Sequence, residues 1–180
     1  MFQMVRANQT FINCSFEGNT AVNGGAAQLL ANATALFFNT SVEHNTAAAA
    51  PKGGGGNGGG IGVGDRAQVR FIGSLLHNNT AELGGGLFVD GNATVNISST
   101  KLVSNSAKKQ GGGAHVAGDA TANTLNSSLL SNNAQAGAGA FATPESPQLH
   151  RRWYGHGPLQ CLKHSALSAF CHMAAAAAFL

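Results

Sequence analysis

Charged residues are scarce in this sequence and make up only 9% of its 180 residues. Between positions 11 and 143, six acidic and six basic side chains balance each other, so the formal net charge of +3 arises in the flanking segments. Nowhere does a basic stripe alternate with aromatic residues. This charge distribution argues against a nucleic-acid partner.

Cysteine is also rare. The three cysteines, Cys14, Cys161 and Cys171, form no CxxC pair and lie in unrelated surroundings. Their spacing predicts neither a disulfide framework nor a zinc site. We expect no metal and no cofactor.

Long apolar runs are missing at both ends. The first residues, 1–6, lack the apolar core of a signal peptide. The Ala-rich stretch from His164 to Leu180 has 17 residues, fewer than the ~20 that a membrane-spanning helix requires. We therefore expect no membrane span, and we expect the sequence to be a fragment or an imperfect gene model.

The sequence does contain a repeat. Its reduced form is an apolar residue, two variable residues, Asn, one variable residue and Ala, followed by a Gly-rich turn and a short apolar strand. Five copies align on an anchoring Asn at intervals of 26, 34, 26 and 27 residues: Asn19, Asn45, Asn79, Asn105 and Asn132. A period in this range is typical of a solenoid. The long interval contains a Gly-rich segment from Ala47 to Asn57, which we interpret as a loop inserted into one coil.

Alternating apolar positions precede each anchor. Counting back seven, five and three residues gives columns that we expect to point inward: Ile12/Cys14/Phe16, Phe38/Thr40/Val42, Ile72/Ser74/Leu76, Ser98/Thr100/Leu102 and Leu125/Ser127/Leu129. Period-two alternation is typical of strands whose side chains stack from coil to coil. Three strands per coil is the simplest count. Because Phe37 and its equivalents are apolar beside an inward column, a bend is expected there.

The Asn column predicts a hydrogen-bonded ladder at one corner of the coil. The Ala two residues after each Asn indicates a tight corner, and the Gly pairs that follow, such as Gly24-Gly25 and Gly84-Gly85, indicate turns with positive φ. If Asn79 is buried in such a ladder, its replacement by Ala should cost about 1 to 3 kcal/mol.

A candidate binding face lies on the strand after the Gly turn. If Leu87 and Val89 point inward, the outward column is Gln28, Gly62, Phe88, His115 and Phe141. Large apolar side chains on the solvent side of a strand often mark contact sites. With coils about 4.8 Å apart, sugar rings could stack in series on Phe88, His115 and Phe141. The alternatives are an inverted parity, or rings that pack under another segment.

Eight Asn-x-Ser/Thr acceptors are present: Asn8, Asn13, Asn32, Asn39, Asn78, Asn92, Asn96 and Asn126. About two would arise from composition alone, so the excess favours an extracellular protein, although Asn and Ser/Thr are also ordinary turn residues. Asn13, Asn39 and Asn126 share the column six residues before the anchor, which we expect to point outward and to accept glycans.

The element Phe16-Glu17-Gly18-Asn19, paired with Gly24-Gly25-Ala26-Ala27, resembles the repeats of chlamydial polymorphic outer membrane proteins and of similar green-algal extracellular proteins. The resemblance covers residues 11–143. It implies an all-β, right-handed parallel β-helix displayed at a cell surface and associated with adhesion. Val42, Leu76, Leu102 and Leu129 depart from the family's preference for Phe.

The chain therefore divides into an N-terminal leader of uncertain structure (1–10), a β-helix of about five coils (11–143) and a non-repeat tail (144–180). The tail contains Trp153 and Tyr154, the only residues of their types. It could be a capping helix, an interfacial anchor or the product of a translated intron or frameshift.

We expect a non-enzymatic extracellular protein of the adhesion type, whose function is display at a surface or the binding of a glycan or cell-surface partner. One alternative is a polysaccharide-active enzyme resembling pectate lyases, which would need clustered acids. Asp65, Asp90 and Asp119 could form a weak row, but Asp beside Gly is ordinary turn chemistry. Another alternative is a structural wall or matrix glycoprotein.

Overall fold

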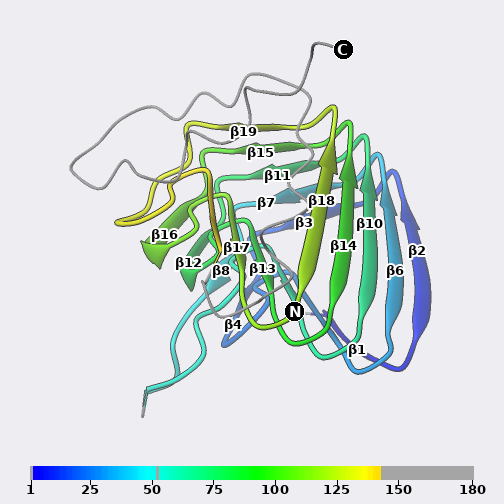
Figure 1. Ribbon diagram of the computed structural model, residues 1–180, viewed down its shortest axis with the longest axis horizontal. Coiled ribbons are helices and arrows are strands. Elements are labelled where there is room, and N and C mark those ends of the chain that lie inside the picture. Colours follow the sequence, from blue (N-terminus) through cyan, green and yellow to red (C-terminus); the bar gives the residue numbers. More distant parts are fainter. Residues whose placement is uncertain (1, 52, 143–180) are drawn as a thin grey trace, which may run out of the picture.

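A computed structural model of the protein describes residues 2–51 and 53–142. These residues form a parallel β-helix whose coils stack from the N-terminal to the C-terminal end (Figure 1). The predicted all-β solenoid of about five coils is confirmed. The tail from residue 144, with its predicted helix or cap, lies outside the described residues.

Four sheets run along the solenoid, and we call them A to D. Sheet A contains β1 (Phe2–Val5), β5 (Ala27–Leu30), β9 (Ile61–Val63), β13 (Leu87–Val89), β17 (Ala114–Val116) and β20 (Ala140–Ala142). Sheet B contains β2 (Asn8–Ile12), β6 (Thr34–Phe38), β10 (Gln68–Ile72), β14 (Thr94–Ser98) and β18 (Thr121–Leu125). The segment 2–10, which the sequence left as a leader of uncertain structure, contains β1 and most of β2.

Sheet C contains β3 (Ser15–Glu17), β7 (Ser41–Glu43), β11 (Leu75–His77), β15 (Lys101–Val103) and β19 (Ser128–Leu130). Sheet D contains β4 (Thr20–Ala21), β8 (Thr46–Ala47), β12 (Thr80–Leu83) and β16 (Ser106–Gln110). A full coil therefore has four strands, and the predicted count of three is wrong. The reason is that the stretch before each Asn, expected to be one strand, is divided between sheets B and C, and the residues after the Asn form sheet D.

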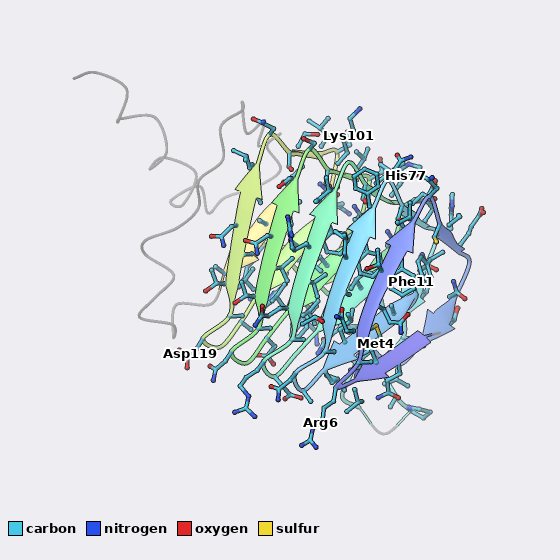
Figure 2. The ribbon with its side chains drawn as sticks, turned by 90° about the vertical axis from the view of Figure 1, so that its right-hand side faces the viewer. Met4, Arg6, Phe11, His77, Lys101 and Asp119 are labelled. Carbon is cyan, nitrogen blue, oxygen red and sulfur yellow. The ribbon has the colours of Figure 1, made fainter. Side chains whose placement is uncertain are left out.

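The division between sheets B and C occurs at a bend six residues before each anchor. Asn13, Asn39 and Asn126 have φ values of 53°, 48° and 49° there. A left-handed residue interrupts the strict alternation of a strand, so the prediction fails for the column seven residues before the anchor. Ile12, Phe38 and Leu125 of that column are 57%, 45% and 50% exposed. Figure 2 shows sheet B face on, with its strands side by side in the order of the sheet.

The core instead contains the neighbouring column. Phe37 and Phe71 are 0% and 1% exposed. The rings of Phe11, Phe37 and Phe71 stack with centroid separations of 4.9 Å. In-register stacking of identical side chains fills the interior of a narrow solenoid, and each buried ring contributes about 1.5–3 kcal/mol by leaving water. The bend expected beside these residues is present, and it allows both Phe37 and Val42 to face the interior.

Sheet A meets sheet D at the Gly-rich turn. Gly58, Gly84 and Gly111 have φ values of 69°, 64° and 68°. The next glycine in each coil has a different role, because a Cβ on Gly59 or Gly85 would collide with the backbone of the adjacent coil. These turns fix the start of each strand in sheet A, and therefore the register of its outward column.

Candidate functional site

The five anchoring Asn side chains are brought together in one ladder between sheets C and D. From the second copy onward, each Oδ1 atom accepts two hydrogen bonds, from the backbone N–H and the Nδ2 of the anchoring Asn in the preceding coil, at 2.9–3.0 Å. Asn45, Asn79 and Asn105 are completely buried. This ladder holds the coils in register and is structural in character, because no part of its interior is open to a ligand.

A second ladder was missed by the sequence reasoning. The hydroxyls of Ser74, Thr100 and Ser127 each accept the backbone N–H of the equivalent residue in the preceding coil at 3.1–3.2 Å. The signal was present in the sequence, since this column contains only Cys, Thr and Ser. Cys14, in the first described coil, donates its thiol to Ile12 O.

The outward column of sheet A has the expected composition and register. Gln28, Gly62, Phe88, His115 and Phe141 are paired in that order across β5, β9, β13, β17 and β20. Leu87 and Val89 are both 0% exposed and point inward. In the structure, Leu87 and Val89 therefore face the interior and Phe88 between them faces outward, which is the assignment on which the binding face depends.

The rings of this face pack on one another. The His115 ring lies 5.3 Å from the Phe88 ring and 5.3 Å from the Phe141 ring, with interplanar angles of 26° and 30°. His115 is only 1% exposed, while Phe88 and Phe141 are partly exposed. The stack leaves no space between successive rings, so sugar rings cannot insert between them.

Burial has an electrostatic consequence for His115. Loss of hydration lowers the pKa of its imidazole, and a hydrogen bond with the Gln110 backbone and the nearby Asp90 charge act in the opposite direction. Nδ1 of His115 has no hydrogen-bond partner among the described residues. A neutral imidazole is the form that suits a position between two apolar rings.

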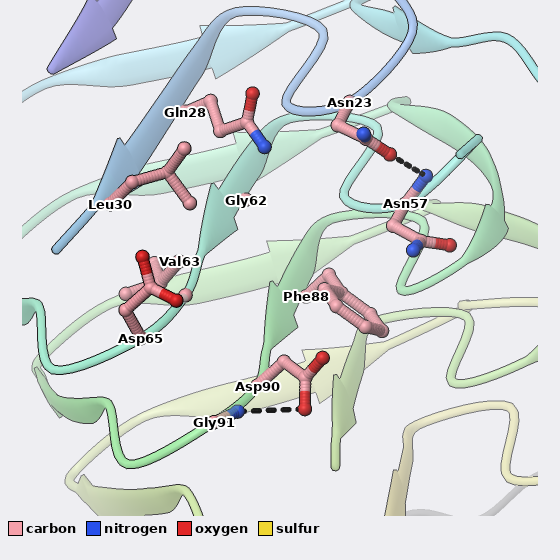
Figure 3. Close-up of a pocket in the computed structure, with 11 residues that line it drawn as sticks. Asn23, Gln28, Leu30, Asn57, Gly62, Val63, Asp65, Phe88, Asp90 and Gly91 are labelled. Atoms are coloured by element: carbon pink, nitrogen blue, oxygen red, sulfur yellow. Dashed lines mark hydrogen bonds between the residues drawn. The ribbon is translucent and has the colours of Figure 1, made fainter. Parts of the chain in front are cut away.

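A hollow of about 230 Å³ lies beside the ring stack, over β5, β9 and β13 (Figure 3). Its lining includes Gln28, Gly62 and Phe88 of the outward column, the turn residues Asp65 and Asp90, and Asn23 and Asn57 at the other end. The sequence placed the first three residues in the outward column and offered Asp65 and Asp90 only as members of a weak row of acids, whereas Asn23 and Asn57 were not predicted. The available signal was Gly62, the one residue of that column without a side chain.

The inserted loop positions one end of the hollow. The loop is closed by two backbone hydrogen bonds, in which the Ala50 N–H donates to Gly54 O at 2.9 Å and Ala50 O accepts from the Gly53 N–H at 2.8 Å. The loop projects away from the coils (Figure 1). Its last residues return to the solenoid, where the Asn57 N–H donates to Asn23 Oδ1 at 3.2 Å and Asn57 O accepts from Gly24 N at 2.9 Å. The insertion thus places an additional amide side chain at the rim.

Glu82 supports the same loop. Gly56 O accepts the Glu82 N–H at 2.7 Å. The Glu82 carboxylate accepts a hydrogen bond from Lys108 Nζ at 2.7 Å and lies 3.7 Å from Lys109 Nζ. The hydrogen bond from Lys108 is the main reason that the pKa of Glu82 is lowered. The backbone hydrogen bond joins the base of the loop to sheet D, and the ion pairs connect β12 to β16 within that sheet.

The three aspartates do not form a row. Since Val63, Val89 and Val116 are paired in register, Asp65 follows its valine by two residues, Asp90 by one and Asp119 by three. Asp65 Oδ2 accepts the Ala31 N–H at 2.9 Å, and Asp90 Oδ1 accepts the Gly91 N–H at 2.7 Å. Within residues 2–51 and 53–142, no group of three acidic, His or Cys side chains could hold a metal ion.

The predicted glycan acceptors Asn13, Asn39 and Asn126 are exposed at the bend between sheets B and C. Asn39 Nδ2 donates to Asn13 Oδ1 at 2.7 Å, so these side chains also have a role in the turn. In the described part of the chain no helix is long and apolar enough to span a membrane.

Comparison with known proteins agrees with the architecture. A family described as right-handed beta helix region matches residues 2–143. Neither a curated protein nor a solved structure matches the chain.

Proposed function

Since this chain belongs to the right-handed β-helix family, we propose that it is a non-enzymatic extracellular surface protein, of the polymorphic outer membrane protein type, that binds glycans through the outward face of sheet A. A fold alone does not define a function, so the proposal depends on the site. The observation that carries it is the pair of partly exposed rings, Phe88 and Phe141, which pack on either side of the buried His115 ring on sheet A, beside a hollow lined by amides and carboxylates.

Aromatic rings and polar side chains are the two components that sugar binding requires. A ring offers a flat apolar surface for the C–H face of a sugar, and amide or carboxylate groups exchange hydrogen bonds with its hydroxyls. The scaffold holds both components without further ordering, because the column is fixed by parallel pairing from β5 to β20. The exposed acceptors at Asn13, Asn39 and Asn126 support an extracellular location.

The test is to replace Phe88 and Phe141 together by Ser and to measure both thermal unfolding and retention on a glycan array. Because both side chains point outward, we expect a folded variant with greatly reduced retention. Phe38→Ser is the matched control, since Phe38 is a 45% exposed Phe on sheet B and its loss should leave retention unchanged. Unchanged retention by the double variant would refute the proposed face, and collapse of its stability would show that the rings belong to the core.

A polysaccharide-active enzyme is the second candidate, because Asp65 and Asp90 line the same hollow as Phe88. Acid–base cleavage of a glycosidic bond uses a pair of carboxyl groups. Release of reducing ends from a bound glycan, abolished in an Asp65→Asn/Asp90→Asn variant, would support this enzyme. A chain that is glycosylated but retains no glycan would instead be a structural matrix glycoprotein.

A further inference from the structure

The outward column of sheet A has one gap. In four coils this column has a side chain, from Gln28, Phe88, His115 or Phe141, whereas Gly62 has none. Neighbouring parallel strands lie about 4.8 Å apart, so Gln28 and Phe88 are separated by roughly 10 Å along the column. One ring placed between them would contact both neighbours at ordinary van der Waals distances of about 3.5–4 Å.

The ring face of Phe88 is available on the side of this gap. Its opposite face is covered by His115, with the centroids 5.3 Å apart and the planes inclined by 26°. A Cβ atom on Gly62 would meet only ordinary contacts, at 3.4 Å from Gly24 N, 3.5 Å from Gly24 Cα and 3.8 Å from Asn57 O. The β9 backbone therefore forms the floor of an open slot with Phe88 as one wall.

Polar groups surround the slot and are partly unused. Within the described residues, the side chains of Gln28 and Asn57 make no hydrogen bond. Asp65 and Asp90 each use one carboxylate oxygen for a turn N–H, which leaves the other oxygen available. Figure 3 shows these groups at both ends of the slot, with Asn23 and Asn57 on one side and the two aspartates on the other.

We propose that this slot binds a single neutral pyranose unit, stacked on Phe88 as the missing member of the column and hydrogen-bonded by Gln28, Asn57, Asp65 and Asp90. This rests on the proposed function and specifies its ligand. The hollow of about 230 Å³ is smaller than the roughly 300–1,000 Å³ of sites for drug-sized ligands, which fits one sugar ring.

The charge of the slot selects against acidic sugars. Two carboxylates line it, and no Lys or Arg is among its described lining residues. A uronate would bring a third carboxylate to this region, and the resulting repulsion has no cationic partner to offset it. Neutral sugars have hydroxyl donors that suit carboxylate acceptors.

The experiment uses the full chain and saturation-transfer NMR with a panel of methyl pyranosides: glucoside, galactoside, mannoside, N-acetylglucosaminide, and the glucuronide and galacturonide. We expect one or more neutral glycosides to bind and both uronides to bind at least about tenfold more weakly. Gly62→Phe should fill the slot and abolish binding while the chain keeps its thermal unfolding transition. Gly62→Ala is the control, because its methyl group is accommodated, and it should retain binding.

Phe88→Leu gives a second measurement, since it keeps an apolar side chain and removes the flat ring. We expect at least tenfold weaker binding from it. Retained glycoside binding in Gly62→Phe would overturn the slot while leaving glycan binding elsewhere on the face intact. Binding of uronides as strong as that of neutral glycosides would overturn the assignment to a neutral pyranose. Binding of the cation choline, with no binding of the neutral glycosides, would also overturn it. Absence of glycan binding in the wild-type chain, on the array as well as in solution, would refute the proposed function itself.

Discussion

Replacing Asn79 by Ala tests the ladder that keeps the coils in register. The Asn79 side chain is completely buried and takes part in four hydrogen bonds. Its Nδ2 donates to Val42 O at 2.8 Å and to Asn105 Oδ1 at 2.9 Å, and its Oδ1 accepts from Asn45 N and Asn45 Nδ2, both at 3.0 Å. All four are lost in the Ala variant.

The free-energy cost follows from what remains. Asn45 Nδ2 keeps a bond to Phe16 O, but the buried Asn45 N–H loses its acceptor, which costs about 1–3 kcal/mol. Loss of the amide–amide bond to Asn105 adds about 1 kcal/mol. We therefore expect the free energy of unfolding to fall by about 2–4 kcal/mol, the upper part of which exceeds the value predicted from the sequence alone.

Denaturant unfolding monitored by circular dichroism measures this change. Asn126 is exposed but is a poor control, because its φ of 49° makes Ala unfavourable there for a separate reason. Asn92→Ala is a better control, since Asn92 is exposed and lacks positive φ, and it should change stability by less than about 0.5 kcal/mol. A similarly small loss in Asn79→Ala would refute the structural role of the ladder.

Two further predictions concern pH and glycosylation. Because burial lowers the pKa of His115 below its usual 6.5, the unfolded state binds a proton more readily than the folded state, so the stability that His115 contributes is present above pH 6.5 and is lost as pH falls toward the folded-state pKa. Thermal unfolding followed from pH 7.5 to 5 should show this loss in the wild type and a smaller loss in His115→Phe; equal slopes would contradict the argument. Expressed in a secretory eukaryotic host, the chain should gain glycosidase-sensitive mass at Asn13, Asn39 and Asn126, and an unmodified product would leave these residues with a turn role only.

Much of the fold could be predicted because one copy of the sequence repeat corresponds to one coil of the solenoid. Each Asn of the ladder is identical from coil to coil, and the Gly turn fixes the register of the strand that follows, so Leu87 and Phe88 could be assigned to opposite faces of sheet A. The alternation failed at Phe38 and Ile12, because a positive φ at Asn39 and Asn13 changes the parity in a way that apolar patterning does not reveal.

The candidate site was only partly predictable for a different reason. The outward column could be derived from Phe88 and His115, but the contact between their rings depends on side-chain packing. The hollow depends on the return path of the inserted loop, which brings Asn57 beside Asn23. The interval of 34 residues between Asn45 and Asn79 indicated an insertion, but it gave no information on where the end of the loop lies.

The most direct test of the binding face is to map the wild-type chain's backbone amide chemical shifts during titration with a glycan that it retains. We expect the largest changes at Gln28, Asn57, Gly62 and Phe88, around the slot in sheet A. Changes centred on the exposed column of sheet B at Ile12 and Phe38, or the absence of any change at saturating glycan, would contradict binding at the slot.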